Sequence, residues 1–339
     1  MLLEDYCGAI AIHKNTSTGN YDVFVGGKTL SNAFQSGGGQ NPNAKYDAFI
    51  AKLSGTDGSI SWVRQIEEAT GTADAKCTAL ATDSSGNVYC GGYVAESPID
   101  GESKTGTNDI FIVKYDSSGN KVVSYQHGVA GNSYINDIAI DSSNNIFAVG
   151  KTNGNLNGTN SGNHDGFILK IDSNLTDGLD DIYQVKTADV APAGDATGDE
   201  SFRNLQINSS GAPVVFGYTT GSVDGENNAD ANRDPLLLKF SSDLTSISWV
   251  KQYGVNTATA AGQINDAASG NIVQDYDDFL GSSLVINPDG SIYFGSVIQT
   301  LGFGFSANTR GGGIKAGGDA SHDPWIMKIQ ESVGALKAD

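Results

Sequence analysis

Five recurring positions carry side chains whose oxygens could do chemistry. Each lies nine residues before one of five similar turns, and we call the set the acidic column: Glu4, Asp74, Asn132, Asp199 and Asp278. Carboxylate and amide oxygens gathered at one place suit a hard cation such as Ca²⁺, or a polar ligand. Two carboxylates about 5–10 Å apart are also what a general acid and a general base need to hydrolyse a glycosidic bond. The acidic column therefore predicts a binding site or, as an alternative, a carboxylate pair.

A structural explanation of the acidic column competes with both. Asp and Asn side chains close turns by accepting hydrogen bonds from nearby backbone N–H groups. Catalytic residues are expected to break the symmetry of a repeat, whereas the acidic column follows it. Turn closure before each strand is therefore the favoured explanation, and the acidic column is kept as a candidate binding site.

A second candidate calcium site lies in a loop where acidic and amide residues alternate, at Asp224, Glu226, Asn228 and Asp230. This loop lacks the central Gly and the final Glu of an EF-hand loop. A solvated acidic loop explains the same pattern. Calcium is the one cofactor that the sequence brings into consideration, and no cofactor is required.

Nucleophilic and redox chemistry find little support. The four histidines do not combine with Ser, Cys or Asp in a recognisable catalytic or zinc-binding spacing, and no phosphate-binding glycine loop is present. The odd set of three cysteines, Cys7, Cys77 and Cys90, is expected to be buried free thiols, with one disulfide left open.

The charge of the chain excludes several classes of partner. The 339 residues include 20 Lys and Arg against 39 Asp and Glu, which gives a formal net charge of −19. Such an excess of acid repels phosphate backbones and anionic lipids, so we expect no nucleic-acid partner and no membrane insertion. The first residues carry no basic segment followed by an apolar one, so no signal peptide is visible.

Two segments recur five times and organise these residues. The first begins with an Asp and ends with a Lys, at 47–52, 109–114, 165–170, 234–239 and 323–328. The second precedes a turn of Asp, Asn, Ser and Gly, at 8–12, 78–82, 136–140, 203–207 and 282–286. With the strands between and after them they predict units of four antiparallel strands, A to D, joined by short turns.

Five such units favour a radial arrangement, because stacked sheets bury one another's faces and leave only short edges. A two-sheet sandwich is the alternative, but it does not require equal units. The fold class predicted is therefore all-β, a five-bladed β-propeller with four antiparallel strands per blade. We expect a single domain over 1–339, with blades at about 1–66, 74–127, 132–186, 199–253 and 278–339.

The repeat also resembles a known family. An Ile-Ala-Ile strand, an Asp-Ser-Ser-Gly-Asn turn as at 83–87, an aromatic strand and the Asp-x-Phe-Ile-x-Lys segment are similar to the bacterial β-propeller repeats called SBBP. The resemblance implies the propeller fold for nearly the whole chain and says little about function, because propellers host many roles. The family's name assumes seven blades, so five repeats fit either a five-bladed ring or part of a longer chain.

The long loops decide the functional prediction. They connect strands B and C on one face of the predicted ring, and long loops on a rigid scaffold are a usual binding surface. We expect a non-enzymatic binding or structural module of a surface or virion assembly, which recognises protein or glycan through this face as part of a larger assembly. The expected location is extracellular, on a cell surface or in a virion. The alternative is a glycan-active hydrolase that uses the acidic residues at the central channel.

Overall fold

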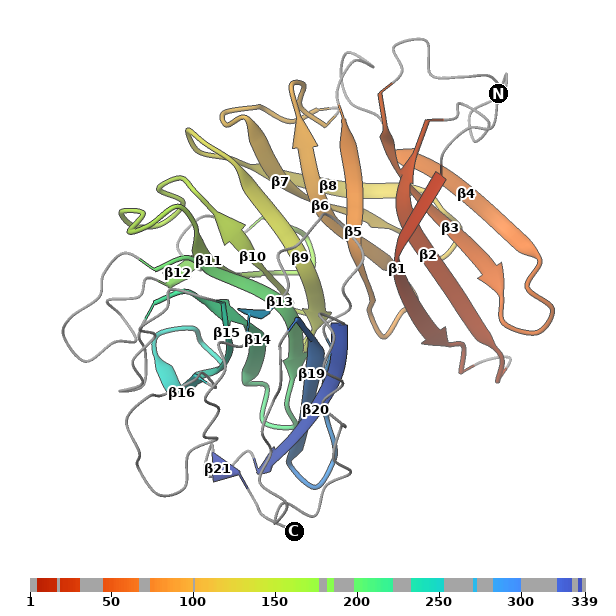
Figure 1. Ribbon diagram of the computed structural model, residues 1–339. Helices are drawn as coiled ribbons and strands as arrows, with labels where there is room; N and C mark the ends of the chain where they lie inside the picture. Colours follow the sequence, from red (N-terminus) through yellow and green to blue (C-terminus); the bar gives the residue numbers. More distant parts are fainter. Residues whose placement is uncertain are drawn as a thin grey trace, which may run out of the picture. The chain divides into compact units, whose positions relative to one another are not determined.

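The computed structural model describes residues 5–16, 19–30, 45–66, 74–99, 101–176, 182–185, 198–221, 233–252, 271–272, 283–299, 322–330 and 335–336. Within these ranges every regular element is a β-strand (Figure 1). Accordingly, the described residues contain no helix with the length and apolar character needed to cross a membrane. The all-β prediction is confirmed.

The strands form five antiparallel sheets. The first runs in the order β1 (Asp5–Lys14), β2 (Tyr21–Thr29), β3 (Asp47–Ser54) and β4 (Ile60–Ile66). The second runs β5 (Ala75–Thr82), β6 (Val88–Ala95), β7 (Asn108–Tyr115) and β8 (Lys121–His127). The third contains β9 (Ser133–Ile140), β10 (Ile146–Thr152), β11 (Asp165–Ile171) and β12 (Ile182–Val185). These strands take the places A to D that the repeat predicts.

The last two sheets continue the pattern. The fourth runs β13 (Glu200–Ile207), β14 (Pro213–Thr219), β15 (Asp234–Phe240) and β16 (Ile247–Gln252). The fifth contains β17 (Asn271–Ile272), β18 (Ser283–Ile286), β19 (Ser291–Gln299), β20 (His322–Gln330) and β21 (Ala335–Leu336). The chain divides into two compact units, 1–159 with 168–182 and 160–167 with 183–339, and each is described by itself below.

The turns between strands A and B form because one Asp satisfies most of their polar groups. The Asp83 carboxylate accepts from the N–H groups of Ser85 and Asn87 at 2.9 and 3.0 Å. Asp141 makes the same two bonds to Ser143 and Asn145, both at 2.8 Å. An Asp at the first position therefore closes the hairpin, as the turn composition predicts.

A β-bulge interrupts strand A in four sheets. The extra residue of each bulge is Gly8, Thr78, Asn136 or Arg203. The bulge brings strand A so close to strand B that a Cβ at Gly27 or Gly92 would lie within 1.9 Å of a backbone oxygen. Glycine is required there because any side chain would collide with the neighbouring main chain.

Lysines of strand C join neighbouring sheets in the first unit. Lys52 Nζ donates to the Ser117 carbonyl at 3.1 Å, and Lys114 Nζ donates to the Ser173 carbonyl at 3.0 Å. Each lysine also lies over an aromatic ring of its own sheet, Phe24 for Lys52 and Tyr89 for Lys114. The repeated lysine is a scaffold element that connects one sheet to a turn of the next.

Trp62 supports the same junction. Its ring lies between Phe24 of the first sheet and Tyr115 of the second, with centroids 5.9 and 6.3 Å away. The Trp62 indole N–H donates to the Ser117 carbonyl at 3.3 Å. Trp62 therefore packs between the first and second repeats.

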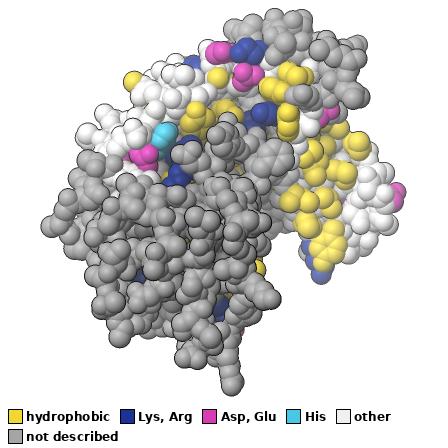
Figure 2. All heavy atoms as spheres, viewed as in Figure 1, with side chains coloured by type: hydrophobic (Ala, Val, Ile, Leu, Met, Phe, Trp, Pro, Cys, Tyr) yellow, Lys and Arg dark blue, Asp and Glu magenta, His cyan; other side chains and the backbone are white. Residues whose placement is uncertain are grey.

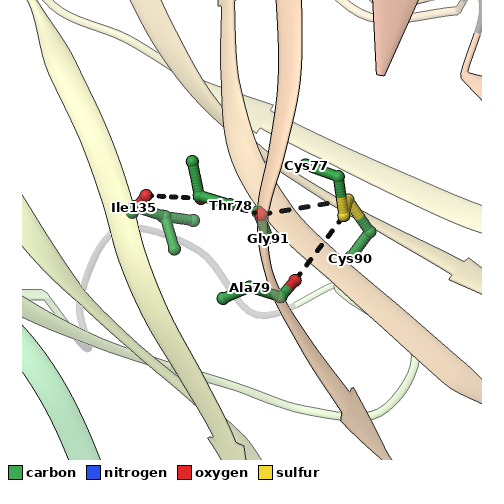
Figure 3. The surroundings of a disulfide bond; sticks show 6 residues. All are labelled: Cys77, Thr78, Ala79, Cys90, Gly91 and Ile135. Carbon is green, nitrogen blue, oxygen red and sulfur yellow. Dashed lines mark hydrogen bonds between the residues drawn. A yellow bond between two sulfur atoms is a disulfide. The ribbon is translucent and has the colours of Figure 1, made fainter. Parts of the chain in front are cut away.

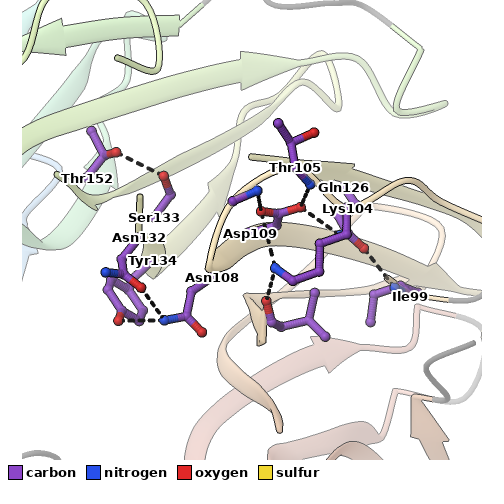
Figure 4. A network of polar contacts seen from close by, with 12 residues as sticks. Ile99, Lys104, Thr105, Asn108, Asp109, Gln126, Asn132, Ser133, Tyr134 and Thr152 are labelled. Atoms are coloured by element: carbon purple, nitrogen blue, oxygen red, sulfur yellow. Dashed lines mark hydrogen bonds and ion pairs between the residues drawn. The ribbon is translucent and has the colours of Figure 1, made fainter. Parts of the chain in front are cut away.

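A buried Asp starts strand C, and a Gln near the end of strand D donates to it. Gln126 Nε2 donates to Asp109 at 2.9 Å, Gln184 Nε2 donates to Asp165 at 2.7 Å, and Gln65 makes the same bond to Asp47. Asp109 is fully buried, and its carboxylate also accepts from the N–H groups of Thr105 and Gly106 (Figure 4). This carboxylate therefore fixes the loop that enters strand C.

The cysteines differ from the expectation of three buried free thiols. Cys77 on β5 and Cys90 on β6 form a disulfide with their Cα atoms 5.8 Å apart (Figure 3). Cys7 is free and exposed. The expectation was wrong because paired strands bring Cys77 and Cys90 within bonding reach across the strand A bulge.

The disulfide gives a direct prediction. Thiol titration of the unfolded, unreduced chain should detect one reactive group, Cys7, and the same titration after reduction should detect three. A Cys7→Ser variant should show none before reduction. Three thiols in freshly purified protein kept from reductant would contradict the assignment.

One face of the first sheet is uncovered within its unit. Ile10 and Ile12 on β1 are 66% and 57% exposed, and Figure 2 shows hydrophobic side chains gathered over this sheet. The residues at the place of Ile10 in the other four sheets are 8% exposed or less: Leu80, Ile138, Leu205 and Leu284. We call the exposed side of β1 that carries Ile10 and Ile12 the Ile10 face. Its side chains are of the apolar kind expected where another part of the structure packs.

Candidate functional site

The structure describes three of the five acidic-column residues. Asp74, Asn132 and Asp199 lie directly before or next to the start of β5, β9 and β13. Glu4 and Asp278 lie outside the described residues, as do all four residues of the candidate calcium loop, Asp224, Glu226, Asn228 and Asp230. Among the residues that are described, no group of three or more His, Cys, Asp or Glu side chains is placed to hold a metal ion.

The column residues fasten the start of strand A to the residues before a strand C. Asp74 accepts from the N–H of Tyr46 at 2.8 Å, and Asp199 accepts from the N–H of Asn163 at 2.8 Å. Asn132 accepts from the side chain of Asn108 at 2.6 Å (Figure 4). The bonds run to a neighbouring strand and do not close a local turn. A shared structural task thus accounts for the recurrence of these oxygen-bearing residues.

Asp74 differs from the other two because a second carboxylate lies beside it. Lys45 Nζ lies 3.3 Å from Asp74 Oδ2 and 3.0 Å from Glu96 Oε1, so both carboxylates contact the same ammonium group. The three side chains are 32%, 42% and 54% exposed for Lys45, Asp74 and Glu96. We call Lys45, Asp74 and Glu96 the carboxylate pair site. It is open to solvent.

The backbone brings Glu96 to this position. Ala95 N–H donates to the Asp74 carbonyl at 2.8 Å, which places the end of β6 beside the start of β5. Glu96 follows directly with a φ of 59°, in the left-handed region that few residues other than Gly adopt. Such backbone conformations often mark functional sites, because the surrounding structure must hold them against their cost.

The two carboxylates of the site stabilise the charged form of Lys45. The hydrogen bond from Lys45 to Glu96, followed by that to Asp74, raises the pKa of the Lys45 ammonium above its ordinary value. Lys45 therefore stays charged across the physiological range and holds the two carboxylates near each other in spite of their repulsion.

Aromatic rings border the carboxylate pair site. Tyr46 follows Lys45 in the chain, and its ring lies 6.0 Å from that of Tyr6 on β1. The Lys28 ammonium lies 4.9 Å from the Tyr6 ring centre and 4.6 Å from that of Tyr46. Aromatic faces next to carboxylates are a common composition of sites that bind sugars, since the ring covers the apolar face of the sugar.

Sequence reasoning found Asp74 but missed its partners Lys45 and Glu96. A signal was present: the place of Lys45 holds Thr107 and Asn163 in the next two repeats, so the lysine breaks the pattern. The difference shows only when the long loops are aligned position by position, because their overall compositions are alike.

Several solved structures are similar in fold. An endo-arabinase from Bacteroides thetaiotaomicron matches at 11% identity and a TM-score of 0.43, over 98% of this chain and 97% of that one. A mannose phosphorylase from Leishmania mexicana matches at 9% identity and a TM-score of 0.41, over 87% and 80% of the two chains. The NanB sialidase from Streptococcus pneumoniae matches at 8% identity and 0.31, over 87% of this chain and 49% of that one. At such low sequence identities and TM-scores, these structures assign no residue role, substrate or mechanism to this chain.

The comparisons correct the functional prediction. The sequence was interpreted as a non-enzymatic binding or structural module, yet these solved structures are described as glycan-active enzymes. A polysaccharide lyase of the ulvan lyase type, at 9% identity and a TM-score of 0.40, belongs to the same class. These descriptions go against the interpretation as a module without enzymatic activity, which is not kept, and the glycan-active alternative is taken up below as a proposal.

The repeat family itself is found directly. The β-propeller repeat described as SBBP matches residues 61–93 and 125–157. Each match runs from strand D of one sheet through strands A and B of the next. No curated protein matches the chain. The resemblance is thus confirmed at two of the repeats, and the chain contains SBBP β-propeller repeats.

Proposed function

We propose that the chain is a glycan-active hydrolase in which Asp74 and Glu96 act as the pair of catalytic carboxyl groups. One observation carries the proposal: both carboxylates contact the same Lys45 ammonium, in a place where the repeat symmetry is broken. Two neighbouring carboxyl groups are the usual requirement for glycoside hydrolysis. The aromatic rings of Tyr6 and Tyr46 supply the sugar-binding surface beside them.

The contacts of each carboxylate assign its role. Asp74 is held by two donors, the Tyr46 N–H and the Lys45 ammonium, and is therefore fixed in position as the base. Glu96 has Lys45 as its one hydrogen-bond partner among the described residues and can turn toward a leaving oxygen. In the reaction, Asp74 takes a proton from water as that water attacks the anomeric carbon. Glu96 must enter the reaction protonated, so its carboxylate first takes a proton from solvent. The Glu96 carboxyl then gives this proton to the departing glycosidic oxygen, and Lys45 stabilises the Glu96 carboxylate that forms.

The experiment that tests the proposal is release of reducing ends from a panel of polysaccharides. The panel should include arabinan, mannan, a sulfated polyuronate and a sialylated glycan, which cover neutral and acidic classes. New reducing ends from at least one of them are the expected result. Folded protein, verified by circular dichroism, that releases none over long incubation would overturn the proposal.

We also infer that the five sheets are the five blades of one propeller and form a single domain. The five-fold recurrence of the two sequence segments supports this. So does the uncovered Ile10 face, because in a ring every strand A has another blade against it.

Ring closure predicts a large effect at an exposed position. Ile10→Asp should lower the free energy of unfolding by about 2–4 kcal/mol, since closure would bury the new carboxylate without a partner. Val122→Asp is the matched control, because Val122 is 55% exposed on a strand D. Chemical denaturation measures both. If both variants lower the free energy of unfolding by the same small amount, ring closure that buries Ile10 is contradicted.

The location we propose is extracellular. The Cys77–Cys90 disulfide supports it, because such bonds persist mainly in oxidising compartments. A polysaccharide substrate outside the cell agrees with that location. The net charge of −19 supports the proposal that neither nucleic acid nor membrane lipid is a partner.

A further inference from the structure

We propose that Lys28, held between Tyr6 and Tyr46, binds the anionic group of an acidic sugar, so that the substrate is a glycan bearing carboxylate or sulfate. This inference rests on the proposed glycan-active function and names its substrate class. The three residues are called the Lys28 subsite.

The geometry of the Lys28 subsite is that of a cation between two rings. The Lys28 ammonium lies 4.9 Å from one ring centre and 4.6 Å from the other, within the range of cation–π attraction. The two rings meet edge to face at 66°. Lys28 on β2 is directly opposite Tyr6 on β1 in the strand register, so the sheet itself sets this arrangement. The ammonium is thereby held in place before any ligand arrives.

The charge of Lys28 lacks an acidic partner in the described part of the chain. Four other lysines of the first unit each lie within 4.0 Å of a carboxylate oxygen: Lys45, Lys52, Lys104 and Lys114. Within the described residues, the interactions of the Lys28 ammonium are with the two aromatic rings alone, although the chain carries 39 acidic residues. A cation kept apart from carboxylates in so acidic a protein is available to an external anion.

The position of the subsite fits an acidic glycan better than a free anion. Tyr46 connects the two sites, because its ring contacts Lys28 and its N–H donates to Asp74. Tyr6 is 36% exposed and offers a surface on which a sugar ring can stack. An acidic substituent on Lys28 would thus orient a chain of sugars toward Asp74 and Glu96.

The alternative is that Lys28 only packs between the tyrosines. Lys28→Met separates the two explanations, because Met keeps an unbranched side chain of similar length and removes the charge. Lys28→Arg restores the charge and the stacking on aromatic rings. Lys14→Met is the matched control, since Lys14 is an exposed lysine at the other end of β1 and its loss changes the net charge equally.

The test is titration calorimetry with polygalacturonate, a sulfated galactan and neutral arabinan. We expect the wild type to bind an acidic polymer, Lys28→Met to bind it about tenfold more weakly, and Lys28→Arg and Lys14→Met to bind it nearly as the wild type does. Preference for polygalacturonate identifies a carboxylate ligand, and preference for the sulfated galactan identifies a sulfate ligand. Equal affinity of wild type and Lys28→Met for the acidic polymers, or binding of arabinan alone, would overturn the inference.

Failure of this inference can be told apart from failure of the proposed function. If the protein hydrolyses a neutral glycan at a rate that Lys28→Met does not change, the inference of an acidic substrate fails and the proposed hydrolase function stands. If the protein binds an acidic polymer through Lys28 but cleaves no glycan, the Lys28 subsite stands and the proposed hydrolase function fails.

Discussion

Replacing Glu96 with Gln is expected to lower the rate of sugar release at least about a hundredfold, because removal of a general acid or base typically costs that much. Gln keeps an oxygen that can accept from Lys45 but holds no proton for the leaving group. Asp74→Asn should have a similar effect, while its amide oxygen still accepts from the Tyr46 N–H. Initial rates on the best substrate of the panel measure both variants, with thermal melts to confirm that they fold.

Asp199→Asn is the matched control for Asp74→Asn. Asp199 accepts from the Asn163 N–H just as Asp74 accepts from that of Tyr46, yet among the described residues Asp199 has no lysine partner. Its replacement should leave the rate within about twofold of wild type. A loss at Asp199 equal to that at Asp74 would assign the chemistry to the acidic column as a whole, and an unaffected Glu96→Gln enzyme would rule out the carboxylate pair site.

Replacing Asp109 with Ala should lower the free energy of unfolding by about 3–5 kcal/mol, the usual cost of removing one partner from a buried charged network. The side chain of Asp109 is fully buried, and the Lys104 ammonium lies 3.5 Å away. The N–H groups of Thr105 and Gly106 and the amide of Gln126 would lose their acceptor. Urea denaturation, followed by tryptophan fluorescence, measures the change.

Two variants make the Asp109 result interpretable. Asp109→Asn keeps one acceptor oxygen and should be less destabilised than the Ala variant. Asp116→Ala removes an exposed turn carboxylate that also accepts two backbone N–H groups, and water replaces those bonds. Its effect should be a small part of that of Asp109→Ala. Equal effects at the two positions would show that burial of the network is not what stabilises it.

Much of the fold could be predicted because it depends on local pattern. The turn at Asp83 and the strands on either side follow from residues that are adjacent in the chain. The five-fold recurrence then gives the number of sheets, since each unit has the same apolar strands and the same short turns. The glycines of strand B, such as Gly27 and Gly92, are visible in the sequence, but only the bulge on strand A explains why they are needed.

The candidate site could not be predicted to the same degree because its residues meet through long loops. Lys45, Asp74 and Glu96 come from three different connections, and their approach depends on how each loop leaves its strand. Nothing in the local sequence of Glu96 indicates the left-handed backbone that turns it toward Lys45. The buried pairs of Asp109 with Gln126 and of Asp165 with Gln184 were likewise missed, although a Gln near the end of strand D recurs.

The lysine junctions have a consequence for how such a protein can change over generations. Lys52 and Lys114 donate to main-chain carbonyl oxygens of the neighbouring sheet, and Trp62 donates to one of the same oxygens. Every amino acid carries that acceptor, so the turn that receives the lysine can mutate without losing the connection. Duplicated units could thus drift apart in sequence and still fit against one another. Shuffling or exchange of whole units by recombination would be tolerated for the same reason.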